Sequence, residues 1–248
     1  MEAGEYAKMR ALEDRYWWFV GRRGLARTLI HRAIPAEPKP ELLDLGCGPG
    51  ALLSEMNGVA KVSGADFSTY ALDYCRERGI LRLARADAES LPFRKDSFDL
   101  VTALDIFEHV EDDDAAFIEA FRVLRPGGAL VLSVPAFRWL WSPHDVALHH
   151  YRRYTRRQIE LRLVDAGFVV ERASYAVFFL FPLVILSRGL ERLRQGPARA
   201  SLPHVPDWLN SLLIGLLAFE SRFVVSGFRL PWGSSVVAVG RKPFSDVE

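Results

Sequence analysis

The stretch Leu42 to Gly50 reads LLDLGCGPG, an apolar run followed by glycines at alternate positions. The run predicts a buried strand, and the glycine turn lets the backbone approach a ligand at the start of a helix. The glycine spacing alone does not decide between a dinucleotide and another ligand, because Gly46 and Gly48 with Ala51 also satisfy the dinucleotide-binding pattern. Asp44 favours a different ligand, since a carboxylate there would repel a pyrophosphate but suits a cationic amino acid.

Outward from this turn, short apolar runs alternate with amphipathic stretches as far as residue 174. The alternation predicts an α/β, doubly wound, mostly parallel sheet covered by helices on both faces. We expect strands at residues 41–45, 59–66, 81–86, 98–104, 129–134, 168–174 and 234–240. We expect helices after the glycine turn and at residues 69–78, 113–124 and 156–166, with a turn at 126–128 and Thr155 as an N-cap.

Acidic residues stand at the ends of two later strands. Asp66 ends the second strand about twenty residues after the turn, where a carboxylate accepts hydrogen bonds from ribose hydroxyls. Phe67 is placed to lie against an adenine, and Asp87 with Ala88 to receive the adenine amino group. The alternatives are a helix cap for Asp66 and an exposed loop for Asp87.

Bulk composition excludes several classes of protein. The chain has 248 residues, a formal net charge of +1 and two cysteines, Cys47 and Cys75. The charge gives no basic field for nucleic acid. The cysteines have no metal-type spacing and favour a reducing cytoplasm, and the N-terminus lacks the order of a signal peptide.

Five stretches in order carry a family resemblance: LLDLGCGPG (42–50), GADFS (64–68), ADAESLPF (86–93), SFDLVTALDIFEHV (97–110) and LRPGGALVLSVP (124–135). The chain resembles class I S-adenosylmethionine (SAM)-dependent methyltransferases of the quinone and small-molecule subgroup. The resemblance implies a seven-stranded Rossmann-like fold whose last strand is antiparallel and lies beside the sixth. It also implies SAM contacts from Asp44, Gly46, Gly48, Asp66, Phe67, Asp87, Ala88, and Leu104 or Asp105.

The ends of the chain resemble a narrower group associated with bacterial lipid and polysaccharide biosynthesis. The stretches are DRYWWFVGRR (14–23), HDVALHHYRRYT (144–155) and PWGSSVVAVGRK (231–242). We therefore expect O-methylation of a hydrophobic or lipid-linked small molecule. A hydroxyl acceptor gains from a base, and the candidates are His109, His144 and His149. Glu108 with histidines could hold a metal, but the weak spacing predicts none.

The region before the first strand is expected to form a helical lid over the acceptor. Its aromatic cluster Tyr16, Trp17 and Trp18 could shape an apolar pocket, although such clusters are usually core. Arg22 and Arg153, with Tyr154, are candidates to hold an acceptor's phosphate or carboxylate. The alternative for the arginines is ion pairing within the chain.

A single domain is expected, with a lid at 1–40, a SAM-binding core at 41–174, an apolar helical insertion at 175–230 and a last strand with tail at 231–248. Neither apolar run of the insertion suggests a membrane-spanning helix. The insertion suits core, a homodimer contact, or a peripheral membrane contact favoured by the following Arg188, Arg192, Arg194 and Arg199. We expect a cytoplasmic enzyme without a nucleic-acid partner; an NAD-dependent oxidoreductase and a non-catalytic membrane-associated protein remain alternatives.

Overall fold

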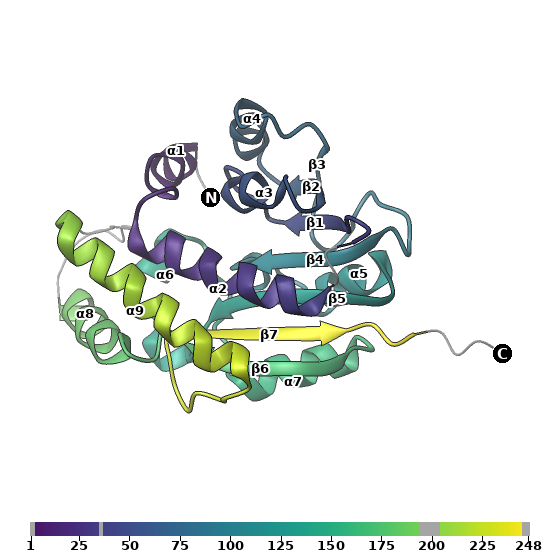
Figure 1. Ribbon diagram of the computed structural model, residues 1–248. Coiled ribbons are helices and arrows are strands. Elements are labelled where there is room, and N and C mark those ends of the chain that lie inside the picture. The colour runs from purple at the N-terminus through teal and green to yellow at the C-terminus, as the bar shows by residue number, and fades with distance from the viewer. Residues whose placement is uncertain (1–2, 35–36, 194–203, 245–248) are drawn as a thin grey trace.

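The computed structural model describes residues 3–34, 37–193 and 204–244 (Figure 1). A twisted sheet lies at the centre with helices on both faces. The strands are β1 (Glu41–Leu45), β2 (Lys61–Asp66), β3 (Leu83–Arg85), β4 (Phe98–Leu104), β5 (Leu124–Pro135), β6 (Val169–Ala176) and β7 (Ser235–Arg241). The α helices are α1 (Ala3–Leu12), α2 (Trp17–Ala33), α3 (Ala51–Met56), α4 (Thr69–Glu77), α5 (Asp113–Val123), α6 (Pro143–Ala147), α7 (Arg156–Asp165), α8 (Phe181–Leu193) and α9 (Asp207–Ser226).

The strand order is β3-β2-β1-β4-β5-β7-β6, and β7 runs antiparallel to both of its neighbours. All other pairs are parallel. Both the predicted α/β class and the implied place of the last strand are therefore confirmed. Because the order reverses between β1 and β4, the carboxyl ends of these strands open a crevice, which is where ligands bind in such sheets.

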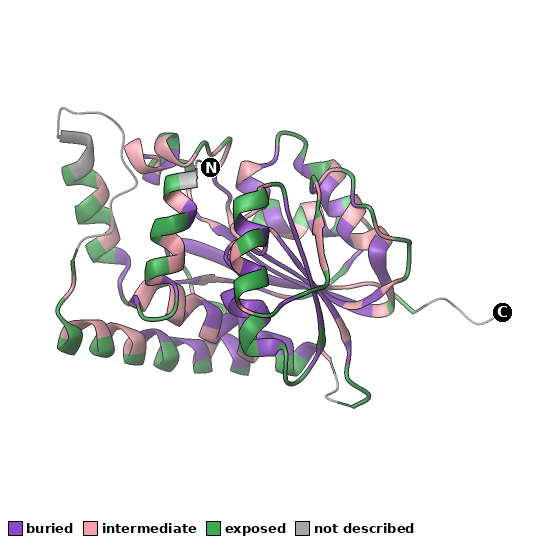
Figure 2. Cartoon of the chain, turned by 90° about the horizontal axis from the view of Figure 1, so that it is seen from above, coloured by how far each residue is buried: buried purple, intermediate pink, exposed green. Residues whose placement is uncertain are grey.

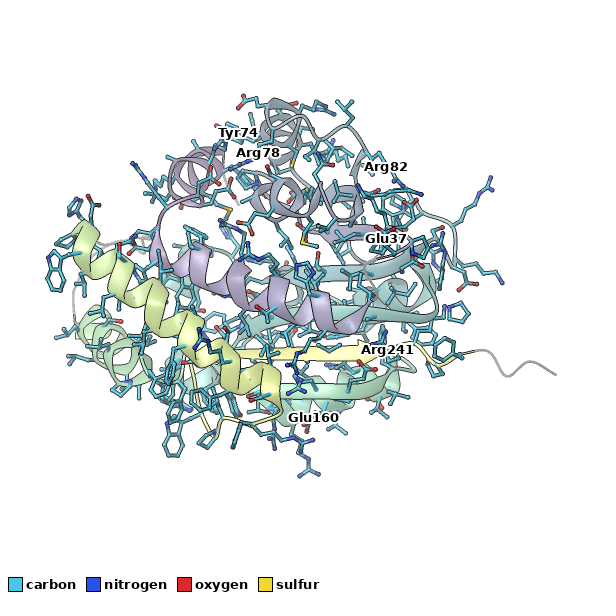
Figure 3. All side chains as sticks on the ribbon, viewed as in Figure 1. Glu37, Tyr74, Arg78, Arg82, Glu160 and Arg241 are labelled. Atoms are coloured by element: carbon cyan, nitrogen blue, oxygen red, sulfur yellow. The ribbon has the colours of Figure 1, made fainter. Side chains whose placement is uncertain are left out.

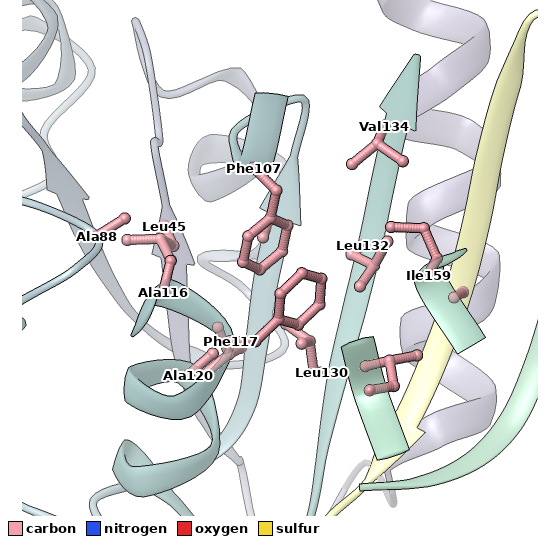
Figure 4. Packing of buried hydrophobic residues seen from close by; sticks show 14 of the residues in the cluster. Leu45, Ala88, Phe107, Ala116, Phe117, Ala120, Leu130, Leu132, Val134 and Ile159 are labelled. Carbon is pink, nitrogen blue, oxygen red and sulfur yellow. The ribbon is translucent and has the colours of Figure 1, made fainter. Parts of the chain in front are cut away.

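Two buried clusters fix the helices against the sheet. On one face α5 and α7 cover the strands, and the rings of Phe107 and Phe117 stack in parallel with centroids 3.9 Å apart (Figure 4). On the other face α2, α3, α4 and α9 supply the apolar side chains. The interior of the sheet is buried almost throughout, whereas the outer sides of the helices are exposed (Figure 2). This packing holds the strand ends at a common edge.

The structure corrects several expected boundaries. The helix α5 ends at Val123, and β5 begins at once and runs through Pro126, Gly127 and Gly128, so the expected turn at 126–128 is wrong. A register shift in the β4–β5 pairing and a φ of +78° at Gly127 let the strand pass this segment. Residues 136–155, which show no periodicity, contain α6 and two short elements around it: 3-10 helix Arg138–Leu140 and an isolated bridge.

The insertion forms α8 and α9, and β6 extends to Ala176, two residues beyond its expected end. Arg194 and Arg199 lie outside the described residues, as do the side chains beyond Leu190 in α8. By length and composition α9 could cross a membrane. A core helix has the same properties, and one side of α9 is buried through Leu217, Glu220, Val224 and Val225.

Candidate functional site

The glycine turn leaves β1 with a left-handed backbone that favours glycine. Gly46, Gly48 and Gly50 have φ of +68°, +52° and +85°. A Cβ added at Gly46 would lie 1.8 Å from Cδ1 of Ile106, a residue that follows β4. Gly46 N donates to the Ala65 carbonyl at 2.7 Å, which ties the turn to β2. The turn is thus held close to the ends of the neighbouring strands.

Asp44 lies at the end of β1 and is almost fully buried. Thr102 Oγ1 on the adjacent β4 donates to Asp44 Oδ1 at 2.6 Å. Burial raises the pKa of the Asp44 carboxyl to about 7; the Thr102 bond opposes this, and the Asp66 and Glu13 carboxylates add to it. The site therefore holds a carboxyl group that a nearby cation would ionise.

Asp66 ends β2 on the other side of the turn and is also buried. Its carboxylate accepts from Gly48 N at 3.0 Å, from Ser68 N at 2.9 Å and from Tyr6 Oη at 3.2 Å. Burial raises the pKa of Asp66, and these hydrogen bonds oppose the increase. The Ser68 bond fixes the residue that precedes α4 and does not cap the helix, so the alternative role of Asp66 as a helix cap is not seen. The carboxylate instead joins the glycine turn to α1 through Gly48 and Tyr6.

The residues expected around an adenine follow β2 and β3. The Phe67 ring is 67% exposed and has the Arg85 guanidinium 5.4 Å from its centroid. Asp87 is exposed and accepts from Glu89 N at 3.1 Å, whereas Ala88 is buried. An exposed aromatic face beside a strand end is available for a planar ligand.

The N-terminal helices cover this edge. Met9 Sδ would lie 3.3 Å from a Cβ added at Gly48. Glu13 and Asp14 at the end of α1 accept from Arg78, which follows α4 and lies beside α1 in Figure 3. These contacts join the lid to the glycine turn and to α4.

Arg22 of α2 does not present a free guanidinium. It pairs with Asp105 and donates to Ser133 Oγ at 2.7 Å, and its guanidinium carbon lies 5.0 Å from the Trp18 ring centroid. Asp105 itself has a φ of +58°, and its backbone N donates to the Ser133 carbonyl at 2.8 Å. The pair ties α2 to the ends of β4 and β5, and the role of Arg22 in acceptor binding stays a prediction.

The aromatic cluster of the lid packs mainly against the insertion. Trp17 and Trp18 contact a small apolar cluster that includes Val177, Leu180 and Leu217. Tyr16 is buried and stacks obliquely with Trp17. A cavity lies beside this contact; its lining includes Arg22, Leu25, Leu104, Ser133, Leu217 and Glu220. Much of the cluster is therefore core, as one of the two interpretations expected, and it borders a mainly apolar cavity.

Arg153 and Tyr154 are buried rather than directed to solvent. Arg153 donates to both carboxylate oxygens of Asp145, at 2.7 and 3.0 Å. Tyr154 Oη donates to Phe107 O at 3.1 Å and to Asp113 Oδ2 at 2.9 Å. Tyr154 holds the segment after β5 against the segment after β4, whereas Arg153 ties the segment after β5 together through Asp145 and the Ala136 carbonyl, so their contacts favour a positioning role.

The expected histidines separate in space, and a fourth one enters. His149 is exposed, and His144 lies in the first turn of α6. His109 instead contacts His150, with ring centroids 4.6 Å apart and planes at 88°. Burial lowers the pKa of His109 to about 3, and the neighbouring His150 adds to this. Asp145 accepts from His150 Nδ1 at 2.9 Å. The two residues are five positions apart, a spacing that no helical periodicity predicts.

Comparisons with known proteins agree with this geometry. Residues 43–132 match a family described as a methyltransferase domain. A ubiquinone/menaquinone biosynthesis C-methyltransferase of Vibrio vulnificus is 33% identical over 129 residues, which are 46% of this chain and 50% of the relative. A demethylmenaquinone methyltransferase of Thermus thermophilus is 40% identical over 114 residues, 43% of this chain and 51% of the relative.

The fold extends the likeness over the whole chain. A chain in the complex of the Haloferax volcanii Trm112 methyltransferase activator with a methyltransferase superposes with a TM-score of 0.62 at 22% identity, covering 99% of this chain and 97% of that one. The chain spans about half the length of the first curated relatives that it matches. Residues 43–132 are thus similar to a methyltransferase domain, and the strand order and the solved structure show that the chain has the Rossmann-like methyltransferase fold.

Proposed function

We propose that the chain binds SAM at the edge formed by β1, β2 and β4 and transfers its methyl group to a hydrophobic small molecule. The observation that carries this proposal is the pair of buried carboxyl groups, Asp44 and Asp66, on either side of the glycine turn. Their charge suits the ammonium and sulfonium groups of SAM. The same charge opposes the pyrophosphate of NAD, which is the reason to rank the oxidoreductase alternative second.

The residues present fit SAM in their chemistry. The positive-φ glycines keep side chains out of the turn. Asp66 offers carboxylate oxygens to the ribose hydroxyls, Asp44 offers a negative charge to the amino-acid end, and Phe67 offers an exposed ring to the adenine. When bound, SAM would supply an electrophilic methyl group, so the chain has to align the acceptor, assist the loss of a hydroxyl proton and exclude water. The lid helices α1 and α2 are placed to do the latter.

A hydrophobic acceptor is supported by the mainly apolar lining between α2, α9 and the sheet, which reaches Leu104 and Ser133 at the ends of β4 and β5. The space there is about 20 Å³, room for about one water molecule, so the helices must move apart for an acceptor to enter. Exposed apolar side chains on α8 and α9, among them Leu183, Leu186, Trp208 and Leu212, are compatible with a lipid-like acceptor. We keep a hydroxyl as the expected acceptor atom. Transfer to carbon is the second candidate, because the named relatives act in quinone biosynthesis and one is a C-methyltransferase.

The acceptor class is tested by incubating the protein with methyl-labelled SAM and an extract of its source cells, followed by separation of organic and aqueous products. The proposal predicts enzyme-dependent label in the organic phase. Cleavage with hydriodic acid, which releases the methyl group of an ether as iodomethane and leaves a C-methyl group in place, then distinguishes O-methylation from C-methylation, with mass spectrometry of the products. Label confined to the aqueous phase would contradict the hydrophobic acceptor while retaining the methyltransferase.

A further inference from the structure

Three side chains that the proposed SAM site does not use converge after β4. Glu108 and His109 belong to the 3-10 helix Phe107–His109, and His150 follows α6. One donor atom from each lies within 4.8 Å of the other two. Tyr151 N donates to the Glu108 carbonyl at 2.7 Å, which joins the two segments through their backbones. The cluster is thus built by the fold from residues about forty positions apart.

Glu108 supplies the observation that points to a ligand. The residue is 1% exposed, and its Oε2 is buried without a hydrogen-bond partner among the described residues. A buried carboxyl oxygen without a partner costs free energy unless a ligand satisfies it. Arg22 and Arg153, whose charges act on Glu108, are paired with Asp105 and Asp145. A cation beside Glu108 would satisfy the unpaired oxygen.

Both histidines have the support that metal ligands require. His150 uses Nδ1 toward Asp145, so its Nε2 is left to face a ligand. His109 has a hydrogen bond with the backbone of Leu148 that favours the protonated ring, so the ring donates to that backbone. A histidine that binds a metal nearly always donates its other ring N–H to a carboxylate or backbone carbonyl, which fixes its tautomer and orientation. His150 has the Asp145 carboxylate as this partner, and His109 has the backbone of Leu148.

We propose that Glu108, His109 and His150 bind one divalent transition-metal ion, with Asp145 orienting His150 from behind. Two imidazoles and a carboxylate suit zinc or ferrous iron and leave an open coordination position, whereas magnesium prefers oxygen ligands alone. Ligands about 2.0–2.2 Å from zinc lie roughly 3.3–3.6 Å apart in a tetrahedron, so the cluster contracts modestly on binding. This site departs from the expectation of no metal, because no local pattern in the sequence predicts that His150 meets His109.

The open position has a chemical use that rests on the proposed function. An oxygen of the acceptor bound there would lose its proton more readily, because a metal ion stabilises the anion. The cluster is close to the cofactor edge, since Ile106, two residues before Glu108, packs on Gly46 of the glycine turn. Metal binding itself does not depend on methyl transfer and can be measured without it.

The test is a Co²⁺ titration of the full chain after dialysis against a chelator, followed by visible absorption and competition with Zn²⁺. Expected are saturation at one ion per chain and cobalt bands that Zn²⁺ removes. Glu108→Gln and His150→Gln should each lose more affinity than the roughly 10- to 100-fold typical of an outer-shell change. The exposed His31 gives the matched control, His31→Gln, which should bind like the wild type.

Each variant is also tested for its circular-dichroism spectrum and for SAM binding, so that loss of the metal is separated from loss of the fold or of the cofactor site. X-ray absorption of the wild-type zinc complex gives a readout that needs no variant, and two imidazole ligands plus oxygen are expected. An absence of saturable Co²⁺ binding, an oxygen-only shell, or unchanged affinity in both folded variants would overturn the site. If the wild type binds the metal but does not bind SAM, the proposed function alone would be overturned.

Discussion

Tyr6 Oη donates to Asp66 Oδ1 at 3.2 Å, across sixty residues of chain. The bond joins α1 of the lid to the carboxylate at the end of β2, and Asp66 at the same time accepts from the glycine turn through Gly48 N. The lid is therefore closed by the same group that is proposed to hold the ribose. Cofactor entry and lid position are linked through one carboxylate.

Tyr6→Phe should weaken the contact between α1 and Asp66 and increase the affinity for SAM. Loss of one hydrogen bond is expected to lower the free energy of unfolding by about 1 kcal/mol. The Asp66 oxygen is then available to the ribose, so SAM should bind faster and more tightly than in the wild type. Stopped-flow fluorescence and calorimetry measure both effects, and weaker SAM binding in a folded Tyr6→Phe variant would contradict the competition.

SAM affinity should depend on pH through Asp44. The pKa of this carboxyl is raised to about 7 in the free protein. Binding of an ammonium group favours the ionised form, so a proton is released on binding below pH 7. The association constant should then rise by up to about tenfold per pH unit as pH approaches 7, and level off above it. Calorimetry across pH 5.5–8 measures this, and Asp44→Asn should bind weakly with a flat profile.

The stability of the free protein should follow the opposite trend. The unfolded Asp44 carboxyl ionises near pH 4, whereas the folded one stays protonated until about pH 7. Unfolding therefore releases a proton between these values, and Asp44 lowers the free energy of unfolding as pH rises through this window. Urea melts of wild type and Asp44→Asn should diverge between pH 4 and 7, with the variant gaining relative stability. Parallel curves would contradict the buried carboxyl.

Gly46→Ala should destabilise the turn, and Gly58→Ala should not. Alanine at Gly46 would have to adopt a φ of +68° and place its Cβ against Ile106. Together the strained backbone and the overlap should cost about 2–4 kcal/mol. An alanine at Gly58 meets no atom within 4 Å and should change stability by less than about 0.5 kcal/mol. Equal denaturation midpoints for the two variants would show that the turn is not held against Ile106.

The sequence predicts most of the sheet because its signal is local. The β1 and β4 strands match their expected bounds, since mainly apolar runs end at a glycine turn and at Asp105. The expected turn at Pro126–Gly128 is wrong because Gly127 and Gly128 exchange backbone hydrogen bonds with Lys242, just beyond β7, and no local propensity predicts that long-range contact. The same strand ends carry Asp44 and Asp66, so their places at one edge of the sheet follow from the local pattern, and their contacts with SAM stay a prediction.

The acceptor side depends on contacts that no local pattern encodes. In the sequence, nothing distinguishes Arg22 and Arg153 from the other basic residues. The fold pairs them with Asp105 and Asp145. His150 and His149 are adjacent in the sequence, and only the fold brings His150 against His109. Long-range pairing of buried charges, rather than periodicity, decides this half of the site.

Direct binding of SAM tests the central claim most simply. Calorimetry should show one SAM per chain for the wild type and for Asp73→Ala, whose carboxylate is exposed on α4. Asp66→Ala should fold and lose SAM binding, and NAD⁺ should not bind the wild type. Saturable NAD⁺ binding without SAM binding, or unchanged SAM affinity in Asp66→Ala, would contradict the account.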